Sequence, residues 1–318
     1  MRVVVTGGAG FIGANLCREL AARPGITEIV AFDDLSTGSA ANLAGLGVRL
    51  VLGSVLDREH LEDVLGGADA VVHLAARPSV PGSMADPVAS HHVNVTGTLF
   101  VLEACRRRRL HLVAASSSSV YGAVPDLPRH EDLPTRPRSP YGAGKLAAEA
   151  YVLAYGAAYQ LPTLALRFFN VYGPLQRAGH AHAPVIPAFI AAALRGEPVR
   201  VHGDGRQTRD FTYVGSVVRV LADAVARRVT CPTPVNLAFG TRASILELTR
   251  LIGEITGAPI DLRHEPARAG DVRDSQATGA LLGRLFPGVS PVPLRTGLEH
   301  TVAWFRDLLA RESAAALT

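Results

Sequence analysis

Tyr141 and Lys145 are separated by four residues in the segment 139–145, which reads Ser-Pro-Tyr-Gly-Ala-Gly-Lys. This spacing places both side chains on the same face of a helix, one turn apart. A phenol has a pKa of about 10 and is a poor base at neutral pH. An adjacent ammonium group favours the phenolate, and we expect it to lower the pKa of Tyr141. The pair is a candidate acid–base couple, although an exposed tyrosine and a surface lysine have the same pattern.

Four consecutive serines, residues 116–119, follow an apolar run at 111–115. The run predicts a buried strand, and ligands of open α/β sheets bind beyond the carboxyl ends of the strands. A serine hydroxyl here could hold a substrate hydroxyl beside Tyr141. A polar turn after the strand is the alternative, but it does not explain why the serines stand at this point of the predicted topology.

Residues 6–13 read Thr-Gly-Gly-Ala-Gly-Phe-Ile-Gly and connect an apolar run to a helical pattern. Gly7, Gly10 and Gly13 permit a tight turn, close approach of the backbone to a pyrophosphate, and close helix–sheet packing. Asp33 follows Gly13 by twenty residues, at the end of the next predicted strand. A carboxylate there accepts hydrogen bonds from both ribose hydroxyls and repels a 2′-phosphate. We therefore predict NAD rather than NADP, and a cationic nicotinamide would favour the Tyr141 phenolate further.

Strand and helix patterns alternate in the first half of the chain, which calls for a parallel sheet covered on both faces. Right-handed crossovers then lead to a Rossmann-type doubly wound α/β fold. A helix is predicted to begin near Ile12, and two more are predicted at 87–107 and 140–159. Strands are predicted at 2–5, 28–32, 48–52, 70–74, 111–115 and 163–167.

The alternation breaks after residue 170, where a long loop is predicted at 173–184. Helices are predicted at 185–195, 217–228, 245–255 and 298–309, and strands at 199–202, 235–238 and 260–263. We predict an NAD-binding domain of residues 1–172, to which a segment of about 210–240 returns. Residues 173–209 and 241–318 would form a smaller, mixed α/β substrate domain, with ligands in the cleft between the two.

Composition excludes several other classes of protein. The formal charge of +4 is modest, and the one dense basic run, 106–109, suits a solvated helix end better than nucleic acid. Three dispersed cysteines are too few for a disulfide framework or a zinc site, and the histidines lack metal-ligand spacing. No apolar run has the length of a membrane span. We expect a cytoplasmic protein without a metal, nucleic acid or membrane partner.

These motifs together resemble the extended short-chain dehydrogenase/reductase superfamily, and within it the UDP-glucose 4-epimerase family. The similarity covers nearly the whole chain and lies in residues 6–13, 33–38, 73–76, Asn94, 116–122, 141–145, 167–174, 203–211 and 268–271. It implies that Tyr141 is the catalytic base, Lys145 its partner and a ribose ligand, and Ser117 the catalytic serine.

The resemblance also implies two sets of binding residues. The NAD site would comprise Gly7, Gly10, Phe11, Ile12, Gly13, Asp33, Asp34, Ser36, Gly38, Ser54, Val55, Leu74, Ala75, Ala76, Asn94, Ser116, Tyr141, Lys145 and Phe168. The nucleotide-sugar site would comprise Ser79, Ser117, Tyr141, Asn170, Val185, Gln207, Arg209, Arg268 and Asp271. Arginine forks suit phosphate oxygens, although a surface ion pair is the alternative for each arginine. The family usually has Asp where this chain has Ser54.

Related dehydratases and decarboxylases usually carry acidic residues just after the catalytic serine or threonine. Here Ser118 and Ser119 follow, and neither acts as a carboxylic acid near neutral pH. The resemblance thus favours 4-epimerisation of UDP-glucose and UDP-galactose, and of N-acetylhexosamines if the small Ser275 lies beside the sugar 2-substituent. Alternatives are a 4-ketoreductase, a 4,6-dehydratase, a decarboxylase, or a non-catalytic NAD-binding regulator, against which Tyr141 and Lys145 argue.

The predicted helices 87–107 and 140–159 carry apolar residues beyond one face, among them Leu146, Tyr151, Val152 and Tyr155. The resemblance implies a homodimer in which these helices form a four-helix bundle.

Overall fold

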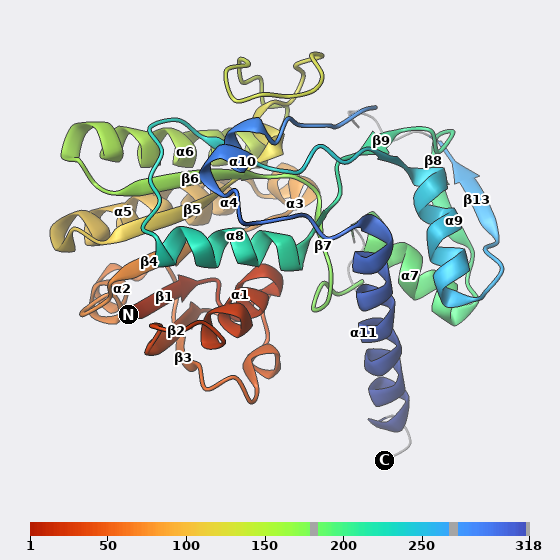
Figure 1. Ribbon diagram of the computed structural model, residues 1–318, viewed down its shortest axis with the longest axis horizontal. Helices are drawn as coiled ribbons and strands as arrows, with labels where there is room; N and C mark the ends of the chain where they lie inside the picture. Colours follow the sequence, from red (N-terminus) through yellow and green to blue (C-terminus); the bar gives the residue numbers. More distant parts are fainter. Residues whose placement is uncertain (179–183, 267–272, 316–318) are drawn as a thin grey trace.

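The computed structural model describes residues 1–178, 184–266 and 273–315. Its centre is a parallel sheet of seven strands in the order β11-β6-β5-β4-β1-β2-β3 (Figure 1). The strands are β1 (Arg2–Thr6), β2 (Glu28–Asp33), β3 (Arg49–Leu52), β4 (Ala70–His73), β5 (His111–Ser117), β6 (Thr163–Phe168) and β11 (Val235–Leu237). The predicted doubly wound parallel sheet is confirmed.

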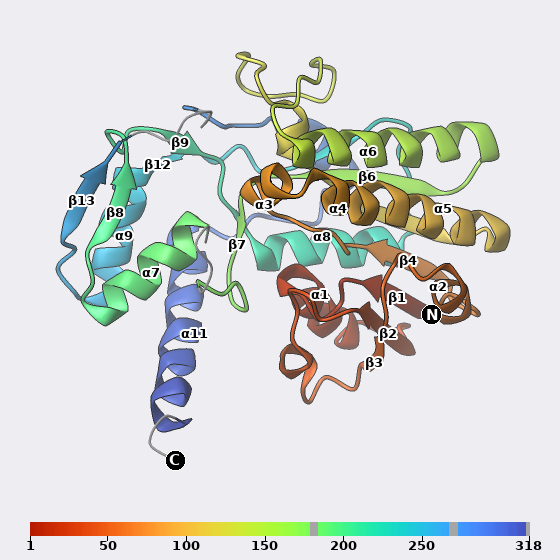
Figure 2. The same cartoon turned by 180° about the vertical axis from the view of Figure 1, so that it is seen from behind.

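Helices cover both faces of this sheet (Figures 1 and 2). Successive side chains of a strand point to opposite faces of the sheet. In β1, Val3 and Val5 belong to the apolar core on one face, and Val4 belongs to the core on the other. Helices α1 (Phe11–Ala21), α8 (Val214–Ala226) and α10 (Ala280–Leu285) contribute to the first core, and α2 (Arg58–Val64), α5 (Gly97–Arg108) and α6 (Pro140–Tyr159) to the second. The β-branched strands are therefore buried on both sides, as a parallel sheet requires.

The start of α6 is fixed by its own sequence. Ser139 is the N-cap and its hydroxyl accepts a hydrogen bond from the Gly142 backbone nitrogen at 3.1 Å. Pro140 occupies the first turn, where its missing N–H removes no helical hydrogen bond. Tyr141 and Lys145 therefore stand in the first two turns of a helix that packs against β5 and β6.

A third core forms beside the sheet from later parts of the chain. Strand β8 (Val199–His202) pairs in parallel with β13 (Leu262–Glu265). Helices α7 (Val185–Arg195), α9 (Ile245–Thr256) and α11 (Leu294–Ala315) surround this pair, and the end of α11 projects away from the rest of the molecule (Figures 1 and 2). The two-stranded sheets β7 (Val171–Tyr172) with β10 (Thr212–Tyr213) and β9 (Thr208–Arg209) with β12 (Ala243–Ser244) complete the fold.

The largest departure from the predicted elements is the helix expected at 87–107. It is divided into α4 (Pro87–His91), a π-helical turn η2 (His92–Thr96), and α5. The wider turn holds Asn94, whose carbonyl oxygen accepts a hydrogen bond from the Thr98 hydroxyl at 2.7 Å. Single π turns of this kind often occur at functional sites.

Several boundaries were also predicted wrongly. Strand β5 continues to Ser117, and the serines after it form a 3₁₀ turn, η3 (Ser118–Val120). Strand β13 begins two residues later than predicted because its pairing with β8 sets its register. Helix α11 starts earlier than expected. The short elements η1 (Ala40–Leu43) and α3 (Val80–Ala85) were not predicted.

No helix among the described residues is long and apolar enough to cross a bilayer. In the same part of the chain, no cluster of His, Cys, Asp or Glu side chains is arranged to hold a metal ion. The three cysteines are free and buried.

Candidate active site

The glycine-rich turn after β1 has no room for a side chain at Gly7, Gly8 or Gly13. Gly7 has a positive φ of 69°, and its nitrogen donates to the Phe32 carbonyl at 2.8 Å. A Cβ at Gly13 would lie 2.1 Å from the Gly7 carbonyl oxygen, and one at Gly8 would lie 2.6 Å from the Ala31 methyl group. The turn leads into α1, whose N-cap residue, Gly10, makes no side-chain capping bond. Its first N–H groups fit an anion such as a pyrophosphate.

Asp33 lies at the end of β2, directly beside this turn. The carboxylate is 7% exposed and accepts hydrogen bonds from the Ala9 nitrogen at 2.9 Å and the Leu35 nitrogen at 2.8 Å. Burial raises the pKa of Asp33, and the backbone hydrogen bonds lower it. A carboxylate has about four acceptor positions, and with the backbone N–H groups of Leu35, Ala9 and Gly10 bonded to it, about one remains for a ribose hydroxyl. The turn and the carboxylate together fit an NAD molecule.

The parallel sheet places the other predicted NAD residues at the same carboxyl edge, because every strand runs in one direction. Ala75 touches the glycine turn, since a Cβ at Gly7 would lie 2.8 Å from its nitrogen. Gly38 packs equally closely on the Ala9 backbone. The remaining members follow or end strands: Phe11 and Ile12 in α1, Asp34 and Ser36 after β2, Ser54 and Val55 after β3, Leu74 and Ala76 after β4, and Phe168 at the end of β6.

Asn94, also predicted to bind NAD, is buried and its side chain is engaged with a neighbouring loop. The amide oxygen accepts from the Arg77 nitrogen at 2.8 Å, and the amide nitrogen donates to the Arg77 carbonyl at 3.2 Å. The π-helical turn therefore fixes the loop that leads to Ser79. The Ser79 hydroxyl caps α3 by accepting from Gly82 at 2.9 Å.

The candidate catalytic residues converge where α6 meets the end of β5. Tyr141 is hydrogen-bonded through its side chain to Ser117. The Lys145 ammonium donates to the Ala115 carbonyl at 3.0 Å and is 7% exposed. Burial lowers the pKa of Lys145 to about 8. Burial raises the pKa of Tyr141, and the hydrogen bond with Ser117 lowers it. Without NAD the pKa of Tyr141 is therefore raised, because desolvation penalises the phenolate, and its lowering by Lys145 and a bound nicotinamide stays a prediction.

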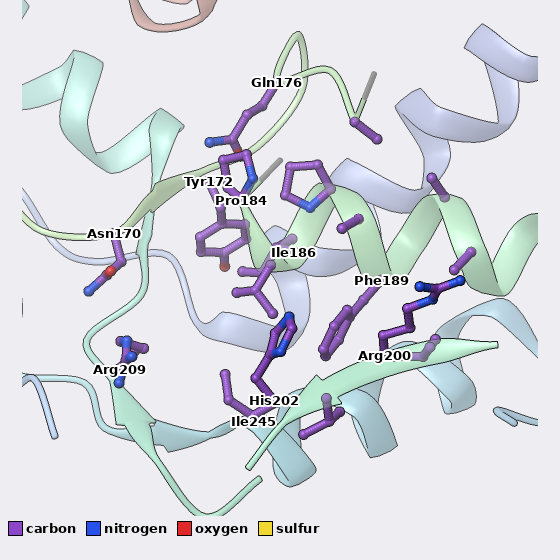
Figure 3. Close-up of a pocket in the computed structure, with 18 of the residues that line it drawn as sticks. Asn170, Tyr172, Gln176, Pro184, Ile186, Phe189, Arg200, His202, Arg209 and Ile245 are labelled. Atoms are coloured by element: carbon purple, nitrogen blue, oxygen red, sulfur yellow. The ribbon is translucent and has the colours of Figure 1, made fainter. Parts of the chain in front are cut away.

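A cavity of about 910 Å³ opens beside β8 and beneath α7 (Figure 3). Four residues predicted to bind the sugar nucleotide line it: Asn170, Val185, Gln207 and Arg209. Ser79, Ser117 and Tyr141 are not among its lining residues, although Val80 is. Arg268 and Asp271 lie outside the described residues.

Asn170 and Arg209 stand at one end of this cavity (Figure 3). Asn170 has a φ of 34°, a conformation that asparagine tolerates better than most residues, and its amide donates to the Asp210 carbonyl at 3.1 Å. Arg209 donates to the carbonyls of Thr208 at 2.9 Å and Arg273 at 3.1 Å. These contacts orient an amide and a guanidinium group toward the same space.

A family model described as "NAD dependent epimerase/dehydratase family" matches residues 3–238. A UDP-glucose 4-epimerase of Mycolicibacterium smegmatis is 37% identical over 318 residues, which are 96% of this chain and 99% of the relative.

The chain belongs to the NAD dependent epimerase/dehydratase family.

Solved structures agree with this assignment. The UDP-glucose 4-epimerase of Thermotoga maritima with UDP-glucose has a TM-score of 0.91 and 33% identity, covering 97% of this chain and 100% of that one. MoeE5 in complex with UDP-glucuronic acid and NAD has a TM-score of 0.85 and 38% identity, covering 96% and 99%. The predicted superfamily and the predicted NAD cofactor are confirmed. The family description covers both epimerases and dehydratases, so membership alone leaves the reaction open.

Two groups of residues in this member of the epimerase/dehydratase family were not predicted from the sequence. Ile186, Phe189 and His202 line the cavity, and the 3-residue spacing of the first two within α7 was the available signal. Glu149 and Arg167 form an ion pair beneath the catalytic residues, with both side chains buried. The spacing of Tyr141, Lys145 and Glu149 at intervals of four was visible in the sequence.

Proposed function

We propose that this protein catalyses the NAD-dependent 4-epimerisation of a nucleotide sugar, with UDP-glucose and UDP-galactose as the substrate pair. The observation that carries the proposal is the arrangement at the end of β5. The Tyr141 phenol is bonded to Ser117, Lys145 is buried beside them, and the next residues are serines rather than carboxylic acids. That set of groups suits reversible proton transfer at one hydroxyl.

The proposed roles follow from these positions. Tyr141 takes the proton of the sugar 4-hydroxyl and later returns it, while Ser117 holds the same hydroxyl by a hydrogen bond. Lys145 favours the phenolate by its charge. When bound, NAD supplies the acceptor and donor of hydride for transient oxidation at C4. Arg209 binds the diphosphate, which keeps the sugar tethered while it presents its other face.

The proposed NAD site is the glycine turn with Asp33 and the carboxyl ends of β3, β4, β5 and β6. We propose residues 1–172 with about 210–240 as the NAD-binding domain, and 173–209 with 241–318 as the nucleotide-sugar domain. The pairing of β11 with β6 supports the return of the chain to the first sheet. The names of the M. smegmatis and T. maritima relatives support UDP-glucose as the substrate.

The decisive experiment is incubation of the purified protein with UDP-glucose, UDP-galactose, their N-acetyl counterparts, UDP-glucuronic acid and dTDP-glucose, without added cofactor. Sugar-proton NMR would show the 4-epimer of one or more substrates. A stable keto product indicates a dehydratase, loss of carbon dioxide a decarboxylase, and net consumption of added NADH or NADPH a ketoreductase. Absence of any turnover favours a non-catalytic NAD-binding regulator.

A Tyr141→Phe variant tests the catalytic assignment. It should retain NAD and the nucleotide sugar and lose about 100- to 10,000-fold in kcat, the usual contribution of a general acid–base group. Near-normal turnover would remove Tyr141 from the mechanism.

A UDP-uronic acid is a second candidate substrate. MoeE5, at 38% identity, is in complex with UDP-glucuronic acid. Ser118 and Ser119 follow Ser117 and are half-buried, and their hydroxyls form no hydrogen bond with the described residues. Hydroxyl donors there suit a carboxylate on the sugar ring. Turnover of UDP-glucuronic acid in preference to UDP-glucose would establish this candidate.

We also propose that N-acetylhexosamines are accepted. Ser275 is buried, and its nitrogen donates to the Thr208 carbonyl at 3.1 Å, next to Arg209. A side chain as small as serine leaves space for an acetamido group. The ratio of turnover for UDP-galactose and UDP-N-acetylgalactosamine tests this, and rejection of the acetamido sugar ends the idea.

We propose a cytoplasmic homodimer formed through α4, η2, α5 and α6. Val88 on α4 is 62% exposed and Tyr151 on α6 is 41% exposed, which is unusual for large apolar residues of packed helices. A dimer would bury this surface. Sedimentation of the purified protein as a monomer would refute the dimer.

A further inference from the structure

Helix α6 and strand β5 are joined by three polar contacts. Tyr141 bonds to the Ser117 side chain, and Lys145 donates to the Ala115 carbonyl at 3.0 Å. One turn further on, Glu149 accepts a hydrogen bond from the Ser116 hydroxyl at 2.6 Å. Residues at intervals of four on the helix thus reach three consecutive residues of the strand. The first two contacts belong to the proposed catalytic groups, and the third has no role in the chemistry.

The third contact is held from the neighbouring strand. Arg167, the partner of Ser116 in the pairing of β5 with β6, binds both oxygens of Glu149, at 2.9 and 2.7 Å. Both side chains are at least 96% buried. The guanidinium also lies 4.7 Å from the centre of the Tyr121 ring. Two hydrogen bonds and a ring face therefore fix the Glu149 carboxylate in one place.

Stability alone does not explain this arrangement. A buried ion pair gains little over two well-packed apolar side chains, because both charges must first be desolvated. What the pair provides and apolar side chains would not is a fixed acceptor for Ser116, directly adjacent to Ser117.

We propose that Glu149, held by Arg167, is a positioning residue for Tyr141 and Lys145, a role that rests on the proposed function of these two groups. By binding Ser116, Glu149 fixes the position of α6 along β5. The first two turns of the helix then hold the phenol at Ser117 and the ammonium at Ala115. Small displacements of reacting groups are costly, since about 1 Å can lower a rate by about 100-fold.

Position rather than charge is the means by which Glu149 acts. Its negative charge is balanced by Arg167 at contact distance. His73 from β4 also faces Lys145; it hydrogen-bonds to Thr6 and Thr98, and burial lowers its pKa to about 3. Neither the Glu149–Arg167 pair nor His73 therefore presents a net charge to the catalytic pair near neutral pH.

The test is a double variant, Glu149→Leu with Arg167→Leu, which removes the contact without leaving an unpaired buried charge. A Ser116→Ala variant removes the same contact with the ion pair intact. For both we expect kcat, measured at saturating NAD, to fall by about 10- to 100-fold, with KM for the nucleotide sugar changed less than about twofold. NAD affinity should also stay within about twofold of the wild type in the double variant, which keeps Ser116. The matched control is Tyr155→Phe, which removes the hydrogen bond at 2.7 Å from α6 to Glu103 on α5. It should leave kcat unchanged.

A second measurement separates positioning from general stability and does not depend on turnover. The phenolate absorbance of each NAD-loaded protein is titrated against the same protein carrying Tyr141→Phe, which isolates Tyr141. Loss of the Glu149 contact should raise the midpoint by about one pH unit, because the ammonium no longer sits at its place beside the phenol. The control should not shift.

The two proposals can fail separately. If no nucleotide sugar is converted by the wild type, yet the Tyr141 midpoint rises in the double variant and in Ser116→Ala, the proposed function fails and the positioning role stands. If both variants keep the wild-type kcat and midpoint, the positioning role is overturned. Should the double variant not fold, Ser116→Ala decides alone by the same two readouts.

Discussion

The glycine turn beneath the NAD site and the cavity beneath α7 are built in opposite ways. The turn is a single stretch of eight residues whose backbone atoms approach so closely that a Cβ at Gly13 would lie 2.1 Å from a carbonyl oxygen. The cavity of about 910 Å³ is bounded by side chains from several elements, among them α7, β8 and β9 (Figure 3).

This contrast indicates which of the two sites tolerates substitutions. A cofactor common to a family is held by backbone groups, so the turn specifies conformation and tolerates no added atoms. The cavity is open and specifies its ligand by a few polar groups, such as Asn170 and Arg209, on an apolar wall. Substitutions in the turn should therefore act on folding and NAD binding, and those in the cavity on the substrate alone.

The largest expected effect is a loss of unfolding free energy at acid pH that arises in the proposed NAD-binding domain. His73 is buried, and burial lowers its pKa from 6.5 to about 3. The unfolded chain binds this proton below about pH 6.5, whereas the folded chain stays neutral to about pH 3. Stability contributed by the neutral ring is thus lost as pH falls through that window, at up to about 1.4 kcal/mol per pH unit. Urea unfolding from pH 7 to 4 should show a shallower pH slope for His73→Asn.

The matched change in the cavity is Gln207→Asn. Gln207 lines the cavity and carries no titratable group, so its substitution should leave the pH slope of stability as in the wild type. If the unfolding free energy of both variants has the wild-type pH slope, the acid sensitivity does not arise from His73 in the proposed NAD-binding domain.

Gly13→Ala is expected to have the next largest effect. The added methyl group must displace the Gly7 backbone, which costs about 3 kcal/mol or more of unfolding free energy. NAD binding should weaken by about 100-fold, since the same backbone faces the pyrophosphate. Isothermal titration and thermal unfolding measure both. Gly283→Ala is the control, because nothing lies within 4 Å of its Cβ position on α10. Equal behaviour of the two variants would contradict the close packing described for the turn.

Arg209→Gln should affect the cavity alone. Loss of a charged hydrogen bond to a diphosphate costs about 2 kcal/mol, so KM for the nucleotide sugar should rise by about 30-fold. NAD affinity should be unchanged, and the free energy of unfolding should fall by no more than about 2 kcal/mol, because the guanidinium also donates to the Thr208 and Arg273 carbonyls. Arg263→Gln is the control, since Arg263 forms an exposed ion pair with Asp261 and neither residue lines the cavity. A large loss of NAD affinity in Arg209→Gln would break the separation of the two regions.

The smallest effect is a change of cofactor preference. Asp33→Asn removes the negative charge that repels a 2′-phosphate and keeps an acceptor for the ribose. We expect the ratio of NAD to NADP affinity to fall by about tenfold, or about 1.4 kcal/mol. Titration with both cofactors measures it. An unchanged ratio would remove Asp33 as the discriminating group.

The same contrast explains which features the sequence could predict. The turn at 6–13, Asp33 and the Tyr141–Lys145 pair were found because their groups are adjacent or regularly spaced, and strand ends of a parallel sheet coincide by geometry. The alternation of strands and helices in the first half of the chain followed from the spacing of apolar residues and the length of each segment. The cavity did not follow, because Ile186 and His202 meet only after α7 packs on β8.

Two local features lay beyond sequence reasoning for separate reasons. The π-helical turn at His92–Thr96 depends on the hydrogen bonds of Asn94 to Arg77, which are long-range contacts. The burial that raises the pKa of Tyr141 was not visible in the sequence, and it outweighs the hydrogen bond from Ser117. In both cases the tertiary surroundings override what spacing alone indicates.

The return of β11 to the sheet has a consequence for synthesis of the chain. Strand β6 ends at Phe168, but its outer neighbour begins only at Val235, after the whole of α7, β8 and α8 has been made. Until then a nascent polypeptide carries β6 as an open edge, ready to pair with another chain. Slow translation or premature release between these two points should therefore yield aggregates, whereas a chain that has passed residue 237 can close its own sheet.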